Sequence, residues 1–380
     1  MSSILGAPIE APRYGGPCLD GVLPSAAAAL GVAEFDNVLR LSRADSMVVL
    51  LVDGLGWRQL EQHRELAPFL SSMEPAAAAG DGIDAAFPTT TPVSLATLGC
   101  GMAPGQHGIV GARFWLPETD AMLLPLSWGQ DPRPEVVQPF HTVLDLCEHQ
   151  GVATTQVGPR VHEGTGLTLA ALNGGHYRGA NTMGERIAEA AAAVRTRPAL
   201  VFVYYGELDQ AGHVHGVDSP HWRHELVQAD RFAYQLAGSL PAGVALVVTA
   251  DHGIVDCPDD ERVELESSTL RERVQRIGGE PRMRHVYTEN GAAEEVCQRW
   301  QTTLGEAASV YTRRAAIDLG LFGPDVTEAA SSRIGDVIAI ARGSVRLGSR
   351  RVDPTVSDLR GQHGALSETE RLVPLLQTVS

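Results

Sequence analysis

The chain alternates between short apolar runs and longer segments in which apolar positions repeat with helical spacing. Residues 46–53, SMVVLLVD, form a continuous apolar run that ends in an acid, as is typical of a strand covered on both faces. Residues 57–73 show helical patterning. Helical patterns then precede apolar runs three times, at 142–149 and 152–157, 182–195 and 199–205, and 222–236 and 244–249. This rhythm predicts an α/β fold with a doubly wound, largely parallel sheet and helices on both faces.

The rhythm weakens in two places, and these places suggest how the chain is divided. Residues 1–43 are rich in Gly, Pro and Ala, and we expect them to form an arm packed on the core. Charged residues become frequent after residue 256, and we expect residues 257–332 to form an inserted smaller lobe. Strand character returns at residues 335–341, GDVIAIA. The predicted core therefore comprises residues 44–256 and 333–380.

Composition and charge narrow the classes of ligand. Hydrophobic residues make up 44% of the 380 residues and charged residues 20%, which excludes a mainly disordered chain. The formal net charge is −16, so a nucleic acid polymer is not an expected partner. A small anionic substrate would need local positive charge against this background, and bound metal ions would supply it.

Cysteine usage and the amino-terminal segment bear on the compartment. The five cysteines are too few for a disulfide framework, and we interpret them as mostly buried thiols in a reducing compartment. The first 30 residues lack a charged segment followed by an apolar one, and the apolar stretch at 26–30 is far too short to span a membrane. We therefore expect a cytoplasmic protein without a membrane partner, and the sequence predicts no particular oligomeric state.

Acids and histidines follow directly after predicted strands. Asp209 and His213 have the i, i+4 spacing that places two side chains on one face of a helix, whereas the adjacent pair Asp251-His252 suits a corner between a strand and a loop. Mixed carboxylate and imidazole ligation favours two Zn²⁺ ions, with Mn²⁺ or Fe possible. The candidate ligands are Asp53, Asp209, His213, Asp251, His252 and His363.

The segment FPTTTPVS contains the candidate nucleophile. Pro92 favours a helix start with Thr91 at the N-cap, where free N–H groups and the helix dipole favour an anion. A threonine hydroxyl becomes nucleophilic when a metal ion or a base activates it. A plain helix cap without any catalytic role is the alternative, because threonine is a good N-cap residue.

These segments resemble ordered motifs of the alkaline phosphatase superfamily. The sequences VVLLVDGLGW, FPTTTPVSLATLGCGMAPGQHGIVG, ELDQAGHVHG, TADHG and GQHG are most similar to those of the type I phosphodiesterase/nucleotide pyrophosphatase branch. The resemblance extends from about residue 47 to residue 376 and implies an alkaline phosphatase-like core that binds two zinc ions. By the family pattern, Asp209, His213 and His363 would hold one ion, and Asp53, Asp251 and His252 the other.

The resemblance also implies the mechanism. Thr91 would bind the second ion and attack phosphorus, and the resulting phospho-threonine would be hydrolysed by water activated at the first ion. Gapless alignment on the family motif selects Thr91, and a slip of one residue would select Thr90, which is the second choice. The family's asparagine, a donor to the phosphoryl oxygen, is replaced here by Ser94. The shorter side chain leaves the choice between diester and monoester substrates open.

Several other residues have two readings. Tyr205, Phe114 and Trp115 are candidates for an aromatic clamp on a nucleotide base, because they lie near the motifs. His107 is expected to order a loop. Arg282 and Arg284 could meet substrate charge, but a solvated face or an internal salt bridge is the favoured reading.

The sequence thus predicts a two-metal hydrolase of phosphate esters, first of all a phosphodiesterase or nucleotide pyrophosphatase whose substrate is a small anionic ester, possibly a nucleotide. One alternative is a phosphomonoesterase, or a phosphonate or sulfate ester hydrolase on the same core. An alternative from another class is a metal-stabilised nucleotide-binding module without turnover.

Overall fold

The computed structural model describes residues 9–379, and its largest element is a sheet of seven strands. Five neighbouring strands, β9, β1, β8, β6 and β7, run parallel, whereas β19 runs antiparallel to β9 and to the short edge strand β2. The predicted largely parallel sheet is confirmed. In spatial order the strands are β2 (Glu74–Pro75), β19 (Leu375–Val379), β9 (Val244–Thr249), β1 (Ser46–Val52), β8 (Ala199–Tyr205), β6 (Ala153–Gly158) and β7 (His176–Gly179).

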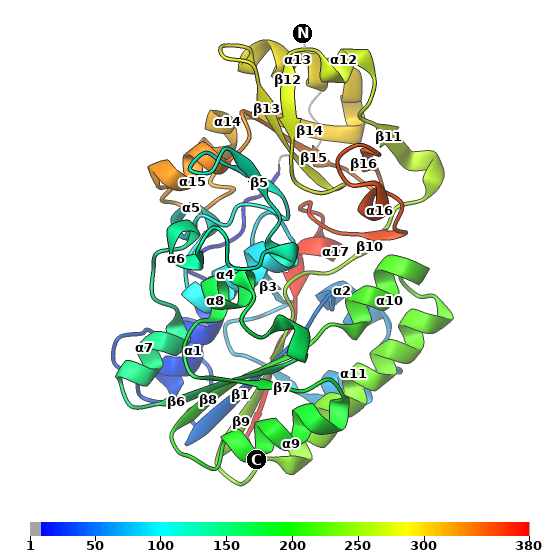
Figure 1. Ribbon diagram of the computed structural model, residues 1–380. Coiled ribbons are helices and arrows are strands. Elements are labelled where there is room, and N and C mark those ends of the chain that lie inside the picture. Colours follow the sequence, from blue (N-terminus) through cyan, green and yellow to red (C-terminus); the bar gives the residue numbers. More distant parts are fainter. Residues whose placement is uncertain (1–8, 380) are drawn as a thin grey trace.

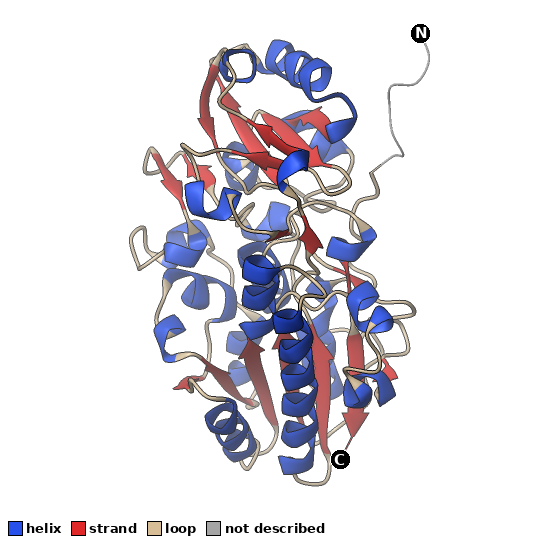
Figure 2. Cartoon of the chain, turned by 90° about the vertical axis from the view of Figure 1, so that its right-hand side faces the viewer, coloured by secondary structure: helices blue, strands red, loops and turns tan. Residues whose placement is uncertain are grey.

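Helices cover both faces of this sheet, as the doubly wound pattern predicts. Figure 1 shows α1 (Val22–Ala29) and α7 (Val143–His149) on one side, and α9 (Met183–Ala193) and α11 (Pro220–Ser239) on the other. Figure 2 shows helices packed over the near face of the sheet. Every residue of β1 is buried, which explains why its apolar run is continuous rather than alternating.

The amino-terminal segment packs on this core from residue 9 onward. Leu19 of the 3₁₀ helix η1 (Leu19–Gly21) and Val22 and Leu23 of α1 belong to the main apolar core. The guanidinium of Arg13 forms an ion pair with the buried carboxylate of Asp84. The predicted arm covers residues 1–43, of which residues 1–8 lie outside the described part of the chain.

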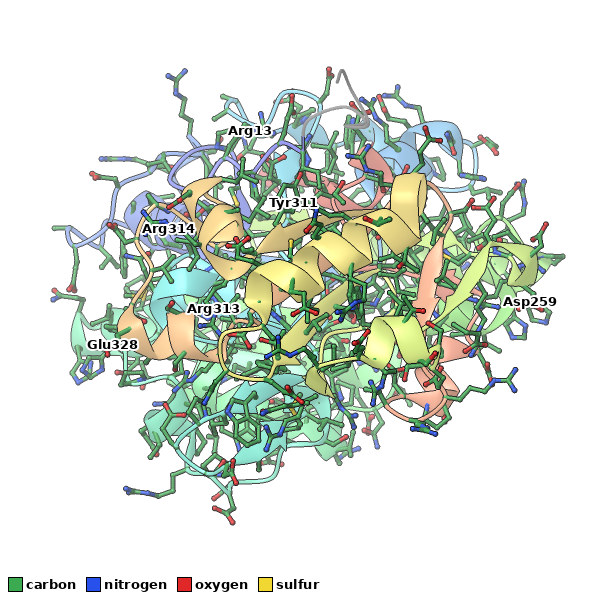
Figure 3. All side chains as sticks on the ribbon, turned by 90° about the horizontal axis from the view of Figure 1, so that it is seen from above. Arg13, Asp259, Tyr311, Arg313, Arg314 and Glu328 are labelled. Carbon is green, nitrogen blue, oxygen red and sulfur yellow. The ribbon has the colours of Figure 1, made fainter. Side chains whose placement is uncertain are left out.

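A second, smaller sheet forms a lobe at one end of the molecule (Figure 1). It is antiparallel, and α13 lies across its outer face when the molecule is seen from above (Figure 3). The lobe has its own apolar core, which includes Val286 and Trp300. Its strands and helices are β12 (Val274–Ile277), β13 (Met283–Thr288), β15 (Val337–Ala341), β14 (Ala308–Thr312), α12 (Ser268–Arg271) and α13 (Ala293–Leu304).

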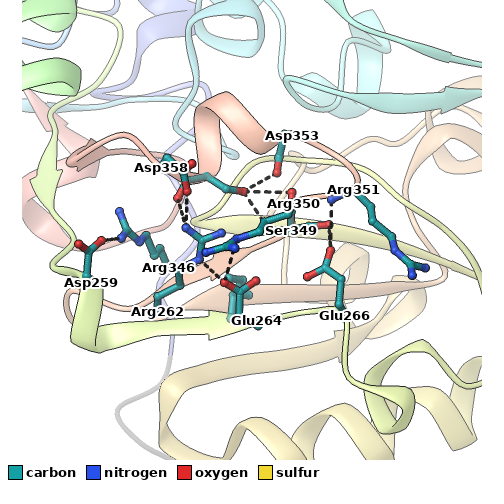
Figure 4. A network of polar contacts seen from close by, with 12 residues as sticks. Asp259, Arg262, Glu264, Glu266, Arg346, Ser349, Arg350, Arg351, Asp353 and Asp358 are labelled. Atoms are coloured by element: carbon teal, nitrogen blue, oxygen red, sulfur yellow. Dashed lines mark hydrogen bonds and ion pairs between the residues drawn. The ribbon is translucent and has the colours of Figure 1, made fainter.

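The lobe extends past the boundary predicted at residue 332. Strand β15 pairs with β13 and β14 of the small sheet, so the segment at 335–341 belongs to the lobe and not to the core. The chain then returns through β16 (Arg346–Gly348), which pairs with β11 (Arg262–Glu264). In this region Arg262 binds Asp358, and Arg346 binds Asp259 (Figure 4). These ion pairs connect the segment that enters the lobe with the segment that leaves it.

The predicted helix at 57–73 is two short helices. The first, α2 (Trp57–Gln62), ends before a turn, and α3 (Pro68–Ser72) begins at a proline, a residue that starts helices well but does not continue them.

All five cysteines are buried and none forms a disulfide, which confirms the reading of buried thiols.

The remaining helices are short. They are α4 (Thr91–Cys100), α5 (Pro104–His107), α6 (Pro134–Val137), α8 (Gly166–Leu172), α10 (Glu207–His215), α14 (Arg313–Asp318), α15 (Glu328–Arg333), α16 (Pro354–Ser357) and α17 (Glu368–Arg371), with the 3₁₀ helices η2 (Pro125–Ser127), η3 (Arg160–His162), η4 (Asp259–Glu261) and η5 (Gly305–Ala307). The small strand pairs are β3 (Ile83–Asp84) with β18 (Leu372–Val373), β4 (Phe114–Leu116) with β5 (Ala121–Leu123), and β10 (Val255–Asp256) with β17 (Gly361–Gln362). Within residues 9–379, no helix combines the length and the apolar character needed to cross a bilayer.

Candidate metal centre and substrate pocket

The candidate ligands meet at the carboxyl edge of the parallel strands, where ligands of open α/β sheets bind. Asp53 follows β1, and the pair Asp251-His252 follows β9. Helix α10, which follows β8, carries Asp209 and His213 one turn apart. His363 follows β17 near the carboxyl end of the chain. Segments distant in sequence are thus brought to one place by the sheet.

The six residues form two groups of three. In one group, Nε2 of His252 lies 3.6 Å from Oδ1 of Asp53 and 3.4 Å from Oδ2 of Asp251. The two groups adjoin, because the rings of His252 and His363 stack with centroids 3.7 Å apart. This division is the one that the family resemblance implies, with Asp53, Asp251 and His252 in one group and Asp209, His213 and His363 in the other.

The second group has the same character. Nε2 of His213 lies 3.2 Å from Oδ2 of Asp209 and also 3.2 Å from Nε2 of His363. The outer nitrogen of each ring faces a backbone carbonyl. Nδ1 of His213 lies 2.7 Å from the carbonyl oxygen of Gly361, and Nδ1 of His363 lies 2.8 Å from the carbonyl oxygen of Thr89. Hydrogen bonds of this kind fix the rings of metal-binding histidines and leave Nε2 free to bind.

Each candidate aspartate has one buried carboxylate oxygen without a hydrogen-bond partner among the described residues: Oδ1 of Asp53, Oδ1 of Asp209 and Oδ2 of Asp251. A buried polar atom without a partner is costly, so an oxygen left in this state points to a ligand. The orphaned oxygens and the inward imidazole nitrogens together fit divalent cations with mixed oxygen and nitrogen ligation.

The pKa values of the three candidate aspartates reflect the burial and crowding of their carboxyl groups. Burial raises the pKa of Asp53 well above its usual range, and the nearby carboxylates of Asp251 and Asp209 raise it further. Burial also raises the pKa of Asp251, against the charge of His252. Burial would raise the pKa of Asp209 as well, but the charge and hydrogen bond of His213, together with the charges of His363 and His252, outweigh burial and the pKa is lowered. Three acids crowded in a buried space favour cations.

Glycine makes room for this crowding. Gly54, directly after Asp53, has φ +74°, and a Cβ there would lie 2.9 Å from Cβ and Oδ1 of Asp209. A larger residue would therefore be strained in its backbone and would collide with a candidate ligand.

The three threonines of the FPTTTP segment have different partners. Helix α4 begins at Thr91, and the N-cap is Thr90 rather than the predicted Thr91. Oγ1 of Thr91 lies 3.2 Å from Nε2 of His252, whereas Oγ1 of Thr89 donates to the carbonyl of Ala365 at 2.8 Å. The hydroxyl of Thr90 is directed to the carboxyl group of Glu280. Burial raises the pKa of that carboxyl group to about 8, and the hydrogen bond from Thr90 acts in the opposite direction. Only the Thr91 hydroxyl therefore faces the Asp53 group.

Ser94 lies one turn further along α4. Its side chain is fully buried, and its Oγ has no hydrogen-bond partner in the described part of the chain. Its spacing places it on the same face of the helix as Thr91.

A cavity of about 420 Å³ opens beside Thr91, a size typical of small-molecule sites. Its floor is a row of side chains from three neighbouring strands, in which Tyr177 is paired with Gln156 and Gln156 with Phe202. Tyr204 also lines the cavity and donates its hydroxyl to Oδ2 of Asp53. Trp128 forms part of another wall. The lining contains no Asp, Glu, Lys or Arg side chain, so the cavity suits an uncharged organic group.

The proposed aromatic candidates do not line this cavity. Phe114 is buried, the ring of Trp115 stacks under the guanidinium of Arg276, and the hydroxyl of Tyr205 donates to Glu225. The alternation of strand β8 could have indicated this, because Tyr204 and Tyr205 must point to opposite faces of the sheet. Trp128 comes from a loop segment to which no motif points.

The site therefore consists of two carboxylate–imidazole groups beside a helix N-terminal hydroxyl, at the carboxyl edge of a largely parallel sheet. Residues 47–366 match the family model for type I phosphodiesterase/nucleotide pyrophosphatase, and the chain belongs to this family. It is therefore a phosphoester hydrolase by family, and the family is metal-dependent. Comparison with curated proteins finds no match.

Solved structures share the fold. Murine ectonucleotide pyrophosphatase/phosphodiesterase 5 superimposes with a TM-score of 0.70 at 18% identity, covering 87% of each chain. An inactive threonine-to-alanine variant of the murine protein, in complex with AMP, gives 0.70 at 18% identity, over 88% of this chain and 87% of that one. The human protein superimposes with a TM-score of 0.67 at 18% identity, and the match covers 88% of this chain and 87% of the human one.

Proposed function

We propose that this chain is a two-metal phosphodiesterase that acts on a small nucleotide-like ester through a covalent phospho-threonine. The observation that carries the proposal is the convergence of four groups on one space: the Thr91 hydroxyl, which lies 3.2 Å from Nε2 of His252, and the carboxylate oxygens of Asp53 and Asp251 that have no hydrogen-bond partner among the described residues. The donor set suits two Zn²⁺ ions, with Mn²⁺ or Fe as alternatives. Bound there, divalent cations supply Lewis acidity and lower the pKa of a coordinated hydroxyl or water.

The chain's own residues would perform the following steps. Thr91 Oγ attacks phosphorus and loses its proton, the bond from phosphorus to the leaving oxygen breaks, and the leaving oxygen takes up a proton. Ser94 Oγ is free to donate to a phosphoryl oxygen in the place of the family's asparagine. The cavity walls, including Trp128 and Tyr204, hold the organic group and exclude water from it. Water then cleaves the phospho-threonine and restores the Thr91 hydroxyl.

The cavity favours a diester over a monoester, since it offers an uncharged organic group a place directly beside Thr91. The murine relative's complex with AMP supports a nucleotide as that group, and its inactive threonine-to-alanine variant supports a threonine nucleophile. Phosphomonoesters, phosphonates and sulfate esters are the alternatives within the same class of site.

The test compares Thr91→Ala with Thr91→Ser and Thr90→Ala, using metal-loaded protein whose zinc content is measured. The substrates are bis-nitrophenyl phosphate, nitrophenyl phosphate and a nucleoside nitrophenyl diester. Loss of the nucleophile should lower kcat on the order of 10³-fold or more, while Thr91→Ser keeps measurable turnover and Thr90→Ala stays close to wild type.

Three results would contradict parts of the proposal. Near-full activity of Thr91→Ala would exclude Thr91 as the nucleophile. Hydrolysis of the monoester with no turnover of either diester would replace the diester assignment by a monoesterase. Zinc-loaded wild type that binds AMP tightly but hydrolyses no ester would show a binding module without turnover.

A further inference from the structure

A turn of the inserted lobe reaches the loop that carries His363. The turn joins β12 to β13 and includes Glu280, a residue that is 6% exposed. Oε1 of Glu280 is buried and has no hydrogen-bond partner within residues 9–379. A buried carboxyl group with an unused oxygen next to a candidate metal centre is unexpected for a structural residue.

The Glu280 side chain packs directly on the His363 loop. Its Oε2 lies 3.8 Å from Nδ1 of His363, the ring nitrogen that also faces the carbonyl of Thr89. A Cβ at Gly364 would lie 2.9 Å from Cγ and 3.0 Å from Oε1 of Glu280. The loop can therefore approach this closely only because residue 364 is glycine. The carboxyl group lies on the outer side of the imidazole, opposite to the ligand atom Nε2.

The same turn holds the loop in a second way. Arg282 forms two hydrogen bonds with Glu370, at 3.0 and 2.8 Å, and both side chains are fully buried. Oε1 of Glu370 in turn accepts the backbone N–H of Ala365 at 3.0 Å. The turn itself is fixed, because the N–H of Gly279 donates to the carbonyl of Arg113 at 2.6 Å. Two side chains of one turn thus act on residues 363–365.

We propose that Glu280 is a positioning residue of the metal centre, which acts from the inserted lobe through His363 on the ion held with Asp209 and His213. The Thr89 carbonyl accepts the Nδ1 proton of His363, and the Glu280 carboxyl group packs against the same edge of the ring, so the two together limit the orientation of the imidazole. Bound cations would favour the ionised form of this carboxyl group, and its negative charge would in turn favour their retention. The inference rests on the proposed metal site. It extends that site to a residue in another lobe, so the lobe contributes to the centre as well as packing on the core.

The test measures metal binding directly. Metal-free wild type, Glu280→Gln and Glu306→Gln are titrated with Zn²⁺ against a chromophoric chelator. Glu306 is an exposed acid of the same lobe, so its variant controls for the loss of one charge. We expect two ions in wild type and in the control, and in Glu280→Gln a weakening of one of the two sites by about 10- to 100-fold. The second site should stay within about twofold.

Kinetics provide a second readout. At limiting Zn²⁺ the Glu280→Gln variant should show a lowered kcat with an unchanged KM, and excess Zn²⁺ should restore kcat, which a folding defect would not allow. If Glu280→Gln fails to fold, Glu280→Asp keeps the charge with a shorter reach and should weaken the same site about 3- to 10-fold. Wild-type affinity of both ions in the variant that folds overturns the inference. Failure of wild type itself to bind two ions would instead contradict the proposed function.

Discussion

The buried ion pair between Arg282 and Glu370 allows a quantitative test of how the lobe is joined to the core. Both side chains are 0% exposed, and two hydrogen bonds connect them. Arg282 belongs to the turn of the lobe, whereas Glu370 belongs to α17 of the core. A pair in this position should be expensive to break from one side only, because the remaining charge stays buried.

The expected magnitudes follow from what each change leaves behind. In Arg282→Met, Glu370 keeps the hydroxyl of Ser367 and the N–H of Ala365 but loses its counter-charge. Breaking a buried pair in this way costs about 3–5 kcal/mol. Glu370→Gln should cost a similar amount, since Arg282 then keeps the carbonyl of Val345 as a partner but has no anion. The double variant removes both charges and should lie within about 2 kcal/mol of wild type.

The pH dependence of this loss adds an independent check. Burial would raise the pKa of Glu370, but the charge and hydrogen bonds of Arg282, together with the hydrogen bonds from Ser367 and Ala365, hold it below its usual range. In wild type the pair therefore contributes stability above the usual carboxyl range, and the contribution is lost as the pH falls through the lowered pKa. In Arg282→Met burial is opposed only by the hydrogen bonds from Ser367 and Ala365, so the pKa of Glu370 should be raised. The deficit of that variant should then shrink as the pH falls and Glu370 takes up a proton.

Urea unfolding followed by tryptophan fluorescence measures these free energies, with the linear extrapolation applied only if a single transition is seen. If the losses of unfolding free energy in the two single variants simply add up in the double variant, the two charges act independently and the reasoning is refuted. An Arg282→Met deficit that is the same at pH 8 and pH 5 would refute it as well.

Two further predictions address the loop and the cavity. Burial lowers the pKa of His107 from its usual value of 6.5 to about 3. Below pH 6.5 the unfolded chain therefore binds a proton at His107 that the folded protein does not bind, and the free energy of unfolding should fall as the pH falls. Between pH 6.5 and 5, wild type should lose about 2 kcal/mol more than His107→Gln in urea unfolding, and equal losses would contradict this. Val161, which is 75% exposed at the rim of the cavity, allows the charge along the approach of the anionic substrate to be changed. Val161→Lys should lower KM for a nucleoside diester and Val161→Glu should raise KM, each about two- to fivefold. Shifts of KM in the same direction would contradict an anionic substrate at this rim.

The parallel core could be predicted because its strands are buried on both faces. Strands β8 and β9 have the predicted bounds, and β1 differs by one residue, since continuous apolar runs are a local signal. The candidate metal ligands could be predicted for a related reason: acids and histidines directly after such strands meet at one edge of the sheet. The structure brings all six together in two groups.

The features that were not predicted depend on contacts distant in sequence. Strand β15 reads as a strand in the sequence, but its membership of the lobe follows only from its pairing with β13 and β14. Strands β19 and β7, at or next to the edges of the large sheet, were missed altogether. Glu280 stands in no motif, and its position beside His363 is set by the lobe. For Arg282 and Arg284 the favoured interpretation was a solvated face or an internal salt bridge, and the structure shows internal salt bridges, with Glu370 and Asp353 as the partners.

The charge of the whole chain and the charge of the site then have to be reconciled. A molecule with a formal charge of −16 repels an anionic ester at a distance, and its candidate centre contains three buried aspartates. Two divalent cations would outweigh these three carboxylates by one positive charge, so binding of metal would change the sign of the site. The cavity beside Thr91 contributes no opposing carboxylate. On the proposed function, attraction of substrate would therefore be confined to the phosphoryl position, and the apolar cavity would select the organic group by shape and contact.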